Sequence, residues 1–258
     1  TKKINPIALM KTILFFIILF MFYFTSLLAG ASFRAKEGMT VAIAANAAPV
    51  VQTVLAIFKS DFEQVFGATI IVQEQAVIHI GTLEDPREWI NTLDPQSLEK
   101  LRTQAEGFLI EVHGDKMYIL GSDKRGTAYG ILELSRLMGV SPWEWWADAT
   151  IAPKTSLKLP NGYRIQKHPS VKHRGIFIND EDWGLMPWSS TTYEPSNRKG
   201  QIGPKTYSRV FELLLRLRAN TLWPAMHEVS IPFYFTPGNK EAADRYGILL
   251  GTSHCEPL

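Results

Sequence analysis

Five consecutive residues at the start of the last third of the chain carry most of its candidate acid–base chemistry. Asn179, Asp180, Glu181 and Asp182 follow an apolar segment, and Trp183 comes directly after them. Cleavage of a glycosidic bond uses carboxyl groups as acid, base or nucleophile. Asn and Asp also favour helix caps and solvated loops. This cluster alone therefore supports a catalytic site and a structural cap or loop equally.

Two further polar groups follow later apolar segments. The first contains Trp223, His227 and Glu228, and the second contains His254 and Glu256. A tryptophan can stack on the face of a sugar, while His and Glu can bind hydroxyls or a carboxylate. Taken alone, the first group fits better with a core tryptophan and a histidine bonded to a local carbonyl.

These residues do not predict a metal or cofactor site. Adjacent side chains at a strand end point to opposite faces, so few of them would converge on one ion. The sequence has no H-x-x-x-H or C-x-x-C spacing. Cys255 adjoins His254 instead of facing it across a cleft, which is a poor arrangement for nucleophilic catalysis. We therefore expect neither a metal nor a cofactor.

The elements that must position these groups alternate between strands and helices. Residues 175–179 predict a buried strand, 206–218 an amphipathic helix, 220–223 a second strand, 241–246 a short helix and 248–251 a third strand. Each polar group then lies at the carboxyl end of a strand, which is where (β/α)₈ barrels place their active sites. This joint placement favours one shared cleft over three unrelated loops.

Upstream, residues 40–160 predict a separate mixed α/β domain of ordinary size. We expect Asp123, Lys124 and Arg125 to cap a helix and to connect parts of this domain, with no contact to the substrate. A linker is expected at residues 153–162. The expected helices are 49–66, 95–107 and 127–138, and the expected strands are 40–44, 70–72, 77–80, 108–112 and 117–120.

The fold class is therefore α/β, an N-terminal mixed domain followed by the first strands of a (β/α)₈ barrel. A complete barrel needs roughly 250 residues, far more than residues 171–258 supply. We expect this sequence to be part of a longer protein and to be inactive alone.

The N-terminus has the pattern of a Sec signal peptide. Lys11 precedes an apolar run at residues 13–24, and small residues end at Ala31, where we expect cleavage. The run is short for a bilayer-spanning helix, although an uncleaved anchor is the alternative. Met10 resembles a natural start, which would leave residues 1–9 untranslated. The prediction is a secreted or periplasmic protein without a membrane span after cleavage.

Composition excludes some classes of protein. A formal net charge of +2 is too small to suggest a nucleic-acid partner. Cys255, the only cysteine, excludes an internal disulfide framework.

Several longer motifs resemble glycoside hydrolase family 115, and the resemblance extends over residues 40–258. The N-terminal motif is shared in part with related glycosidases, including family 67 α-glucuronidases. The matching motifs are residues 121–130 and 140–148 upstream, and residues 174–184, 203–207, 219–228 and 251–257 in the barrel.

The resemblance implies release of glucuronic acid or its 4-O-methyl form from α-1,2 branches of glucuronoxylan, by an inverting mechanism. It places Asn179 and Asp180 at the pocket for the uronic acid, with Asp180 as the candidate catalytic residue. The general acid and base are expected to come at least partly from later strands. The full-length protein is a possible homo-oligomer. The remaining substrate-binding candidates are Trp223, His227, Glu228, His254 and Glu256.

Three other functions stay open. A hexosaminidase-like relative would cleave hexosaminides in place of glucuronoxylan. A carbohydrate-binding protein without activity would lack carboxylates in the later strands. A metal-dependent hydrolase would lose activity on exhaustive chelation.

Overall fold

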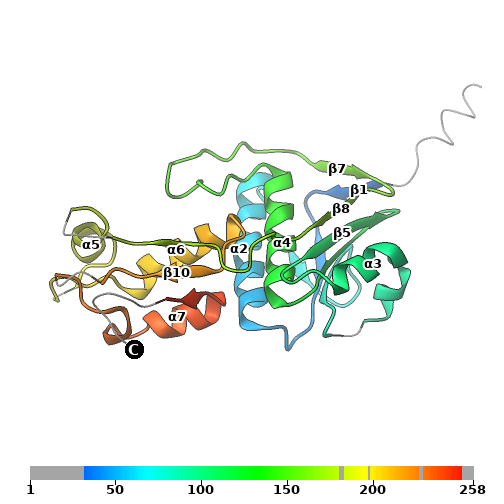
Figure 1. Cartoon of the computed structure of the whole chain (residues 1–258). Coiled ribbons are helices and arrows are strands. Elements are labelled where there is room, and N and C mark those ends of the chain that lie inside the picture. The colour runs from blue at the N-terminus through cyan, green and yellow to red at the C-terminus, as the bar shows by residue number, and fades with distance from the viewer. Residues whose placement is uncertain (1–31, 86, 180–182, 197, 227–228, 252–258) are drawn as a thin grey trace, which may run out of the picture.

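The computed structural model describes residues 32–85, 87–179, 183–196, 198–226 and 229–251. A six-stranded sheet lies at one end and a three-stranded parallel sheet at the other (Figure 1). Helices α2 (Pro49–Phe66) and α4 (Lys124–Met138) stand side by side between them. The molecule is therefore layered, with these two helices shared by both ends.

The six-stranded sheet has the order β3-β2-β4-β6-β5-β8. The first four of these strands are parallel, and β5 is antiparallel to both of its neighbours. The strands are β2 (Thr40–Ala42), β3 (Ile71–Val72), β4 (Ile78–Thr82), β5 (Phe108–His113), β6 (Lys116–Gly121) and β8 (Arg164–Lys167).

Side-chain alternation along β5 gives this sheet two buried faces. Phe108 and Ile110 belong to the large core that contains α2 and α4, whereas Leu109 belongs to a smaller cluster with Leu101. Leu101 lies on α3 (Pro95–Arg102), next to a 3₁₀ helix at Glu88–Thr92. Because successive side chains of a strand point to opposite faces, each face needs its own covering layer.

The helix boundaries in this region follow local chemistry. Pro49 occupies the first turn of α2, and Gly67 ends the helix with φ +66°. Asp123 caps α4 by accepting hydrogen bonds from the backbone nitrogens of Arg125 (3.0 Å) and Gly126 (2.9 Å). The predicted helix at residues 49–66 is thus confirmed, and α4 begins three residues before its predicted start.

Part of the predicted linker is a strand instead. β7 (Leu157–Pro160) pairs antiparallel with β1 (Ser32–Ala35), and neither strand is among the predicted ones. Phe33 of β1 is fully buried in the large core, so the pair is anchored to the domain. Short strands whose partner lies more than 100 residues away leave little local signal.

The second sheet has the order β11-β10-β9, all parallel. Its strands are β9 (Gly175–Phe177), β10 (Thr221–Trp223) and β11 (Leu249–Leu250). α6 (Pro204–Arg216) connects β9 to β10, and α7 (Asn239–Tyr246) connects β10 to β11. This is the predicted β–α–β–α–β order. Shorter turns between these elements are α5 (Leu185–Trp188), a π-helix (Ser189–Tyr193) and a 3₁₀ helix (Phe233–Phe235).

The prediction that residues 175–179 form a buried strand was wrong in one respect. All three residues of β9 are exposed, and Ile176 and Phe177 each keep 47% of their surface accessible. β9 is the edge strand of its sheet, and no described element covers it. An apolar edge strand of a parallel sheet is ordinarily covered on both faces.

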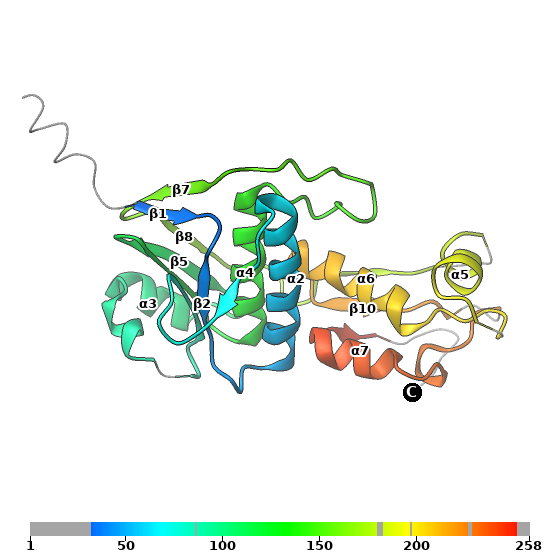
Figure 2. The ribbon, with the colours of Figure 1, turned by 180° about the vertical axis from the view of Figure 1, so that it is seen from behind.

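The two sheets are joined through α2, α4, α6 and α7, whose packing is seen from behind in Figure 2. Arg216 of α6 donates two hydrogen bonds to Asp61 of α2, at 2.9 and 2.8 Å. Tyr129 of α4 donates from its hydroxyl to the carbonyl oxygen of Ala219, at 3.1 Å. Both side-chain donors are buried, so these bonds fix the relative orientation of the two ends.

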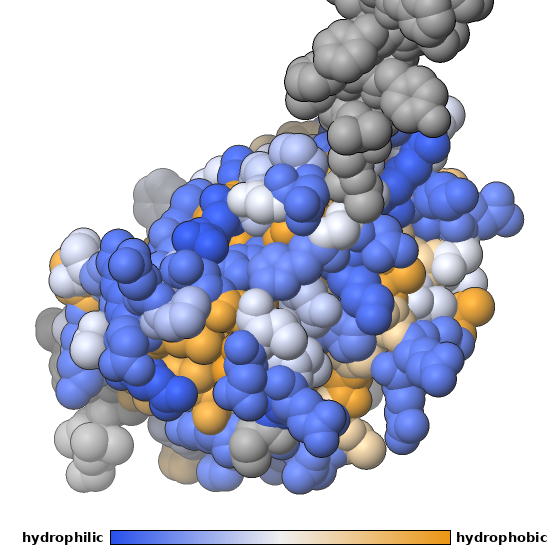
Figure 3. All heavy atoms as spheres, turned by 90° about the vertical axis from the view of Figure 1, so that its right-hand side faces the viewer, coloured by the Kyte–Doolittle hydropathy of each residue, from blue (hydrophilic) through white to orange (hydrophobic). Residues whose placement is uncertain are grey.

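The outer face of the N-terminal end is mostly hydrophilic, with smaller hydrophobic areas between polar side chains (Figure 3). Within the described ranges, no helix combines the length and apolar character needed to cross a bilayer.

Candidate active site

The carboxyl ends of β9, β10 and β11 form one edge of the parallel sheet. Trp223 lies opposite Phe177 in the strand register, and Leu222 lies opposite Ile176. Because side chains alternate along a strand, Trp223 and Phe177 share a face that Leu222 does not. Leu222 is fully buried in the core, whereas Trp223 and Phe177 stay 42% and 47% exposed.

The two exposed aromatic rings contact each other. The ring of Phe177 meets the indole of Trp223 edge-on, with centroids 5.8 Å apart and an interplanar angle of 77°. The pair thus presents exposed aromatic surface at the end of the sheet, and a sugar ring can stack on an exposed aromatic face.

Gly251 makes room for this surface. Its backbone nitrogen donates to the carbonyl oxygen of Leu222 at 2.9 Å, which extends the ladder past the end of β11. A Cβ atom at position 251 would lie 1.7 Å from Nε1 of Trp223. The indole therefore lies directly against the glycine backbone, and only glycine permits that approach.

Asn179 follows β9 at the same edge. The backbone nitrogen of Ile178 donates to the carbonyl oxygen of Trp223 at 2.9 Å, so the strand pairing continues to the residue before Asn179. Asn179 is exposed there. The structure thus brings two of the predicted site residues, Asn179 and Trp223, to one edge, as the strand-end argument predicted.

The other predicted site residues lie outside the described residues. They are Asp180, His227, Glu228, His254 and Glu256. Their assignment to the site stays a prediction. Within the part of the chain that the structure describes, no group of three His, Cys, Asp or Glu side chains could hold a metal ion.

A carboxylate missed by sequence reasoning supports the segment between β9 and α6. Glu194 accepts hydrogen bonds from the backbone nitrogens of Lys205 (3.0 Å) and Thr206 (3.1 Å), and so caps α6. Gly203 lies against it, because a Cβ there would be 2.4 Å from the carboxyl carbon of Glu194. The carboxylate of Glu194 is occupied by these capping bonds. It is therefore not a candidate for acid–base catalysis, although it lies near the strand ends.

α6 also holds the segment that follows Trp223. Ala225 donates its backbone N–H to the buried hydroxyl oxygen of Tyr207, at 3.3 Å. Tyr207 contacts Phe233 edge-on at 4.7 Å, and Phe233 is itself buried. The backbone just beyond Trp223 is therefore fixed by a packed helix.

The opposite, amino-terminal edge of the same sheet carries a buried ionic cluster. Glu106 accepts from Nε of Arg125 at 2.6 Å and from Nδ2 of Asn220 at 2.9 Å, and also from Arg174. Burial opposes ionisation, but the bonds from Arg174 and Asn220 outweigh it and hold the pKa of the Glu106 carboxyl below its usual range. The predicted structural role of Arg125 is confirmed, and it extends across the boundary between the two ends of the molecule.

This division matches the general rule for barrels, in which the amino-terminal face serves stability and the carboxyl-terminal face serves chemistry. Arg174 and Asn220 precede β9 and β10, whereas Asn179 and Trp223 follow or end them. Phe177 and Gly251 were missed as site residues, because the period of two along a strand sets the face of a side chain but not its neighbour on the next strand.

Two family models match the sequence. Glycosyl hydrolase family 115 matches residues 166–258, and the N-terminal domain of glycosyl hydrolase family 67 matches residues 30–134. No curated protein sequence matches the chain.

Solved structures give a more detailed comparison. A family 115 4-O-methyl-α-glucuronidase with specificity for decorated arabinogalactans is 49% identical, with a TM-score of 0.83, over 88% of this chain. The chain spans 30% of that enzyme's length.

Two more distant structures share the fold alone. A chitobiase of Flavobacterium johnsoniae has a TM-score of 0.53 at 13% identity, over 86% of this chain and 32% of its own. An N-acetyl-β-hexosaminidase of Streptomyces plicatus has a TM-score of 0.53 at 14% identity, over 87% of this chain and 43% of its own. With the match at 49% identity and the family 115 model over the strand ends, the chain belongs to glycoside hydrolase family 115.

Proposed function

We propose that the full-length protein is a secreted glycoside hydrolase that removes glucuronic acid, or its 4-O-methyl form, from α-linked branches of a polysaccharide. The observation that carries this proposal is the 49% identity, over 88% of the chain, to a 4-O-methyl-α-glucuronidase. The exposed Phe177–Trp223 surface at the strand ends supports it, because a sugar ring can stack there.

The proposed mechanism is inversion with two carboxyl groups. One carboxylic acid protonates the leaving oxygen, and a carboxylate on the other side activates water, with roughly 6.5–9.5 Å between the two groups to admit that water. Asp180 is the proposed contributor from this chain, because it follows Asn179 at the site edge. At least part of the acid–base pair is proposed to come from strands beyond residue 258.

Around this carboxyl group, the remaining candidates are assigned to substrate binding. Trp223 supplies the stacking face, and Asn179 supplies an amide that can bond sugar hydroxyls. His227, Glu228, His254 and Glu256 follow the ends of β10 and β11, and are proposed to form the walls of the uronic-acid pocket.

Two polysaccharides are candidates for the substrate. The motif resemblance implies α-1,2 branches on xylan, whereas the 49%-identical relative has specificity for decorated arabinogalactans. A direct comparison decides between them. The purified full-length protein is incubated with glucuronoxylan and with arabinogalactan, and the released uronic acid is quantified.

The same experiment tests the mechanism and the alternatives. Proton NMR of the first product should show the β-anomer, since inversion of an α-linkage gives β. Release of hexosamine from hexosaminides instead would favour a hexosaminidase, and no release from any substrate would favour a binding protein without activity. Activity lost on exhaustive chelation would favour a metal-dependent hydrolase.

Secretion is proposed from the N-terminal pattern. The apolar run at residues 13–24 and the small residues before Ala31 fit a cleaved signal peptide. Sequencing the N-terminus of the exported protein should give Ser32 as the first residue. A retained N-terminus in the membrane fraction would contradict cleavage.

A further inference from the structure

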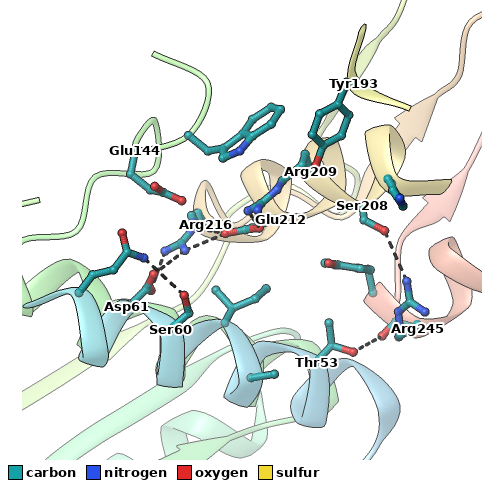
Figure 4. Close-up of a pocket in the computed structure, with 16 residues that line it drawn as sticks. Thr53, Ser60, Asp61, Glu144, Tyr193, Ser208, Arg209, Glu212, Arg216 and Arg245 are labelled. Atoms are coloured by element: carbon teal, nitrogen blue, oxygen red, sulfur yellow. Dashed lines mark hydrogen bonds and ion pairs between the residues drawn. The ribbon is translucent and has the colours of Figure 1, made fainter. Parts of the chain in front are cut away.

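A groove lies between α2 and α6, on the helix side of β10. It has a volume of about 720 Å³, in the range of small-ligand pockets. Thr53 and Ser60 of α2 line one wall, Ser208 and Arg209 of α6 line the other, and Figure 4 shows their polar atoms turned inward. α6 covers the buried side of β10, opposite to the exposed indole of Trp223, so this groove is separate from the strand-end site.

Two cations that line the groove have no carboxylate partner among the described residues. Lys205 and Arg245 are both exposed and line the groove. The guanidinium of Arg245 donates only to the hydroxyl of Ser208, at 3.4 Å. By contrast, Lys240 on the same helix pairs with Asp244 at 2.8 Å. Lys205 and Arg245 are therefore available to an anion from solution.

Aromatic rings line the same groove. Tyr193 contacts Trp145 at 5.1 Å and stacks on Trp188 at 4.9 Å with an interplanar angle of 7°. The guanidinium of Arg209 lies over the ring of Trp145, 5.0 Å from its centroid. Trp145 and Tyr193 line the groove, so a ligand there meets both an aromatic surface and positive charge.

Charge elsewhere in the groove does not cancel these cations. Four cationic and three carboxylate side chains line it, and Asp61 and Glu212 are both bonded to the buried Arg216. Burial raises the pKa of the third carboxyl, Glu144. The groove is therefore positive overall.

We propose that this groove is a second binding site for a sugar that carries a carboxylate, with Lys205 and Arg245 binding the carboxylate and Trp145 and Tyr193 contacting the sugar face. The choice of an acidic sugar rests on the proposed function. Binding here holds an acidic polysaccharide on the enzyme's surface while the strand-end site acts on its branches, which raises affinity through two linked contacts.

Calorimetry on the full-length protein tests this proposal. The probe is a xylo-oligosaccharide that bears one 4-O-methylglucuronic acid. It is titrated at low salt into protein that carries Trp223→Ala and Asp180→Ala, which removes the stacking ring and the carboxyl group proposed for the strand-end site. The double variant Lys205→Ala/Arg245→Ala should weaken this binding at least about tenfold, because it removes the charge-assisted bonds to the carboxylate. Both side chains are exposed, so the variant should fold.

Controls separate the groove from general charge effects. Lys240→Ala, on α7 but outside the groove, should bind the probe as the wild type does. The proposal is overturned if the double variant binds with wild-type affinity, or if the unsubstituted xylo-oligosaccharide or inorganic phosphate binds as tightly as the probe.

The result is independent of hydrolysis. A protein that releases glucuronic acid but shows no second binding event would overturn the groove alone. A protein that binds in the groove but releases no uronic acid from any substrate would contradict the proposed function alone.

Discussion

The indole of Trp223 lies against the backbone of Gly251, where a single added methyl group would come within 1.7 Å of Nε1. The contact joins the end of β10 to the end of β11. The backbone of Gly251 supports the exposed indole of Trp223. The orientation of the indole therefore depends on the absence of a side chain at position 251.

Replacing Gly251 with alanine should therefore displace the indole. We expect kcat/KM of the full-length enzyme on its polysaccharide to fall by about 10²-fold, the cost of a misplacement of roughly 1 Å in a site. Steady-state kinetics and tryptophan fluorescence measure the effect. Gly184→Ala is the matched control, since no atom lies within 4 Å of a Cβ there; equal activity of the two variants would contradict the role of Gly251.

Replacing Asp180 with alanine should lower turnover by several orders of magnitude, because a carboxyl group of the reaction would be lost. Release of uronic acid, followed alongside circular dichroism, measures this. Asp115→Ala, in the exposed turn between β5 and β6, serves as the control. Near-wild-type turnover of Asp180→Ala would refute its assignment to the site.

Replacing Arg216 with methionine should destabilise the protein strongly. The substitution leaves Asp61 buried without its cation and Glu212 with only its bond from Arg209, and breaking a buried ion pair in this way costs about 3–5 kcal/mol. Chemical denaturation of the full-length protein measures the loss. Lys240→Met, which breaks the exposed pair with Asp244, should leave the unfolding midpoint unchanged. Similar effects of both variants would contradict the claim that burial makes the Arg216 pair strongly stabilising.

Acid should unfold the protein partly through Glu133. Burial opposes its ionisation, but bonds from Arg136 and Lys167 and the charge of Arg218 outweigh it and lower the pKa of the carboxyl to about 2. A folded-state pKa below the unfolded one means that this stabilisation is present above about pH 4.5 and is lost as the pH falls towards 2.

The Glu133→Gln variant lacks this carboxylate. The difference in unfolding free energy between the variant and the wild type should therefore shrink as the pH falls from about 4.5 towards 2. Urea unfolding at a series of pH values follows this difference, with exposed Glu241→Gln as the control. A difference that stays constant from pH 6 to pH 2.5 would contradict the assignment.

The sequence predicted the elements whose signals are local. The apolar spacing of residues 49–66 and the bounding Pro49 and Gly67 define α2 completely. The strand-end rule also placed Asn179 and Trp223 at one edge, because parallel strands share their polarity.

Long-range pairing could not be predicted in the same way. β1 pairs with β7 more than 100 residues away, and neither strand has a distinctive pattern. The exposure of β9 depends on which elements cover the sheet, not on the apolar sequence of the strand itself. Likewise, the ionic cluster at Glu106 joins residues from four separate segments, so no spacing in the sequence predicts it.

In α4, every residue from Gly126 to Ser135 is buried, because the helix contacts the six-stranded sheet on one side and the second half of the molecule on the other. A stretch of helix with no solvent face has no positions at which substitutions are readily tolerated. We expect α4 to drift more slowly in evolution than α6, and its residues to change only in concert with those of both neighbours. Exchanging the N-terminal region between distant relatives should therefore fail unless both contact surfaces are exchanged with it.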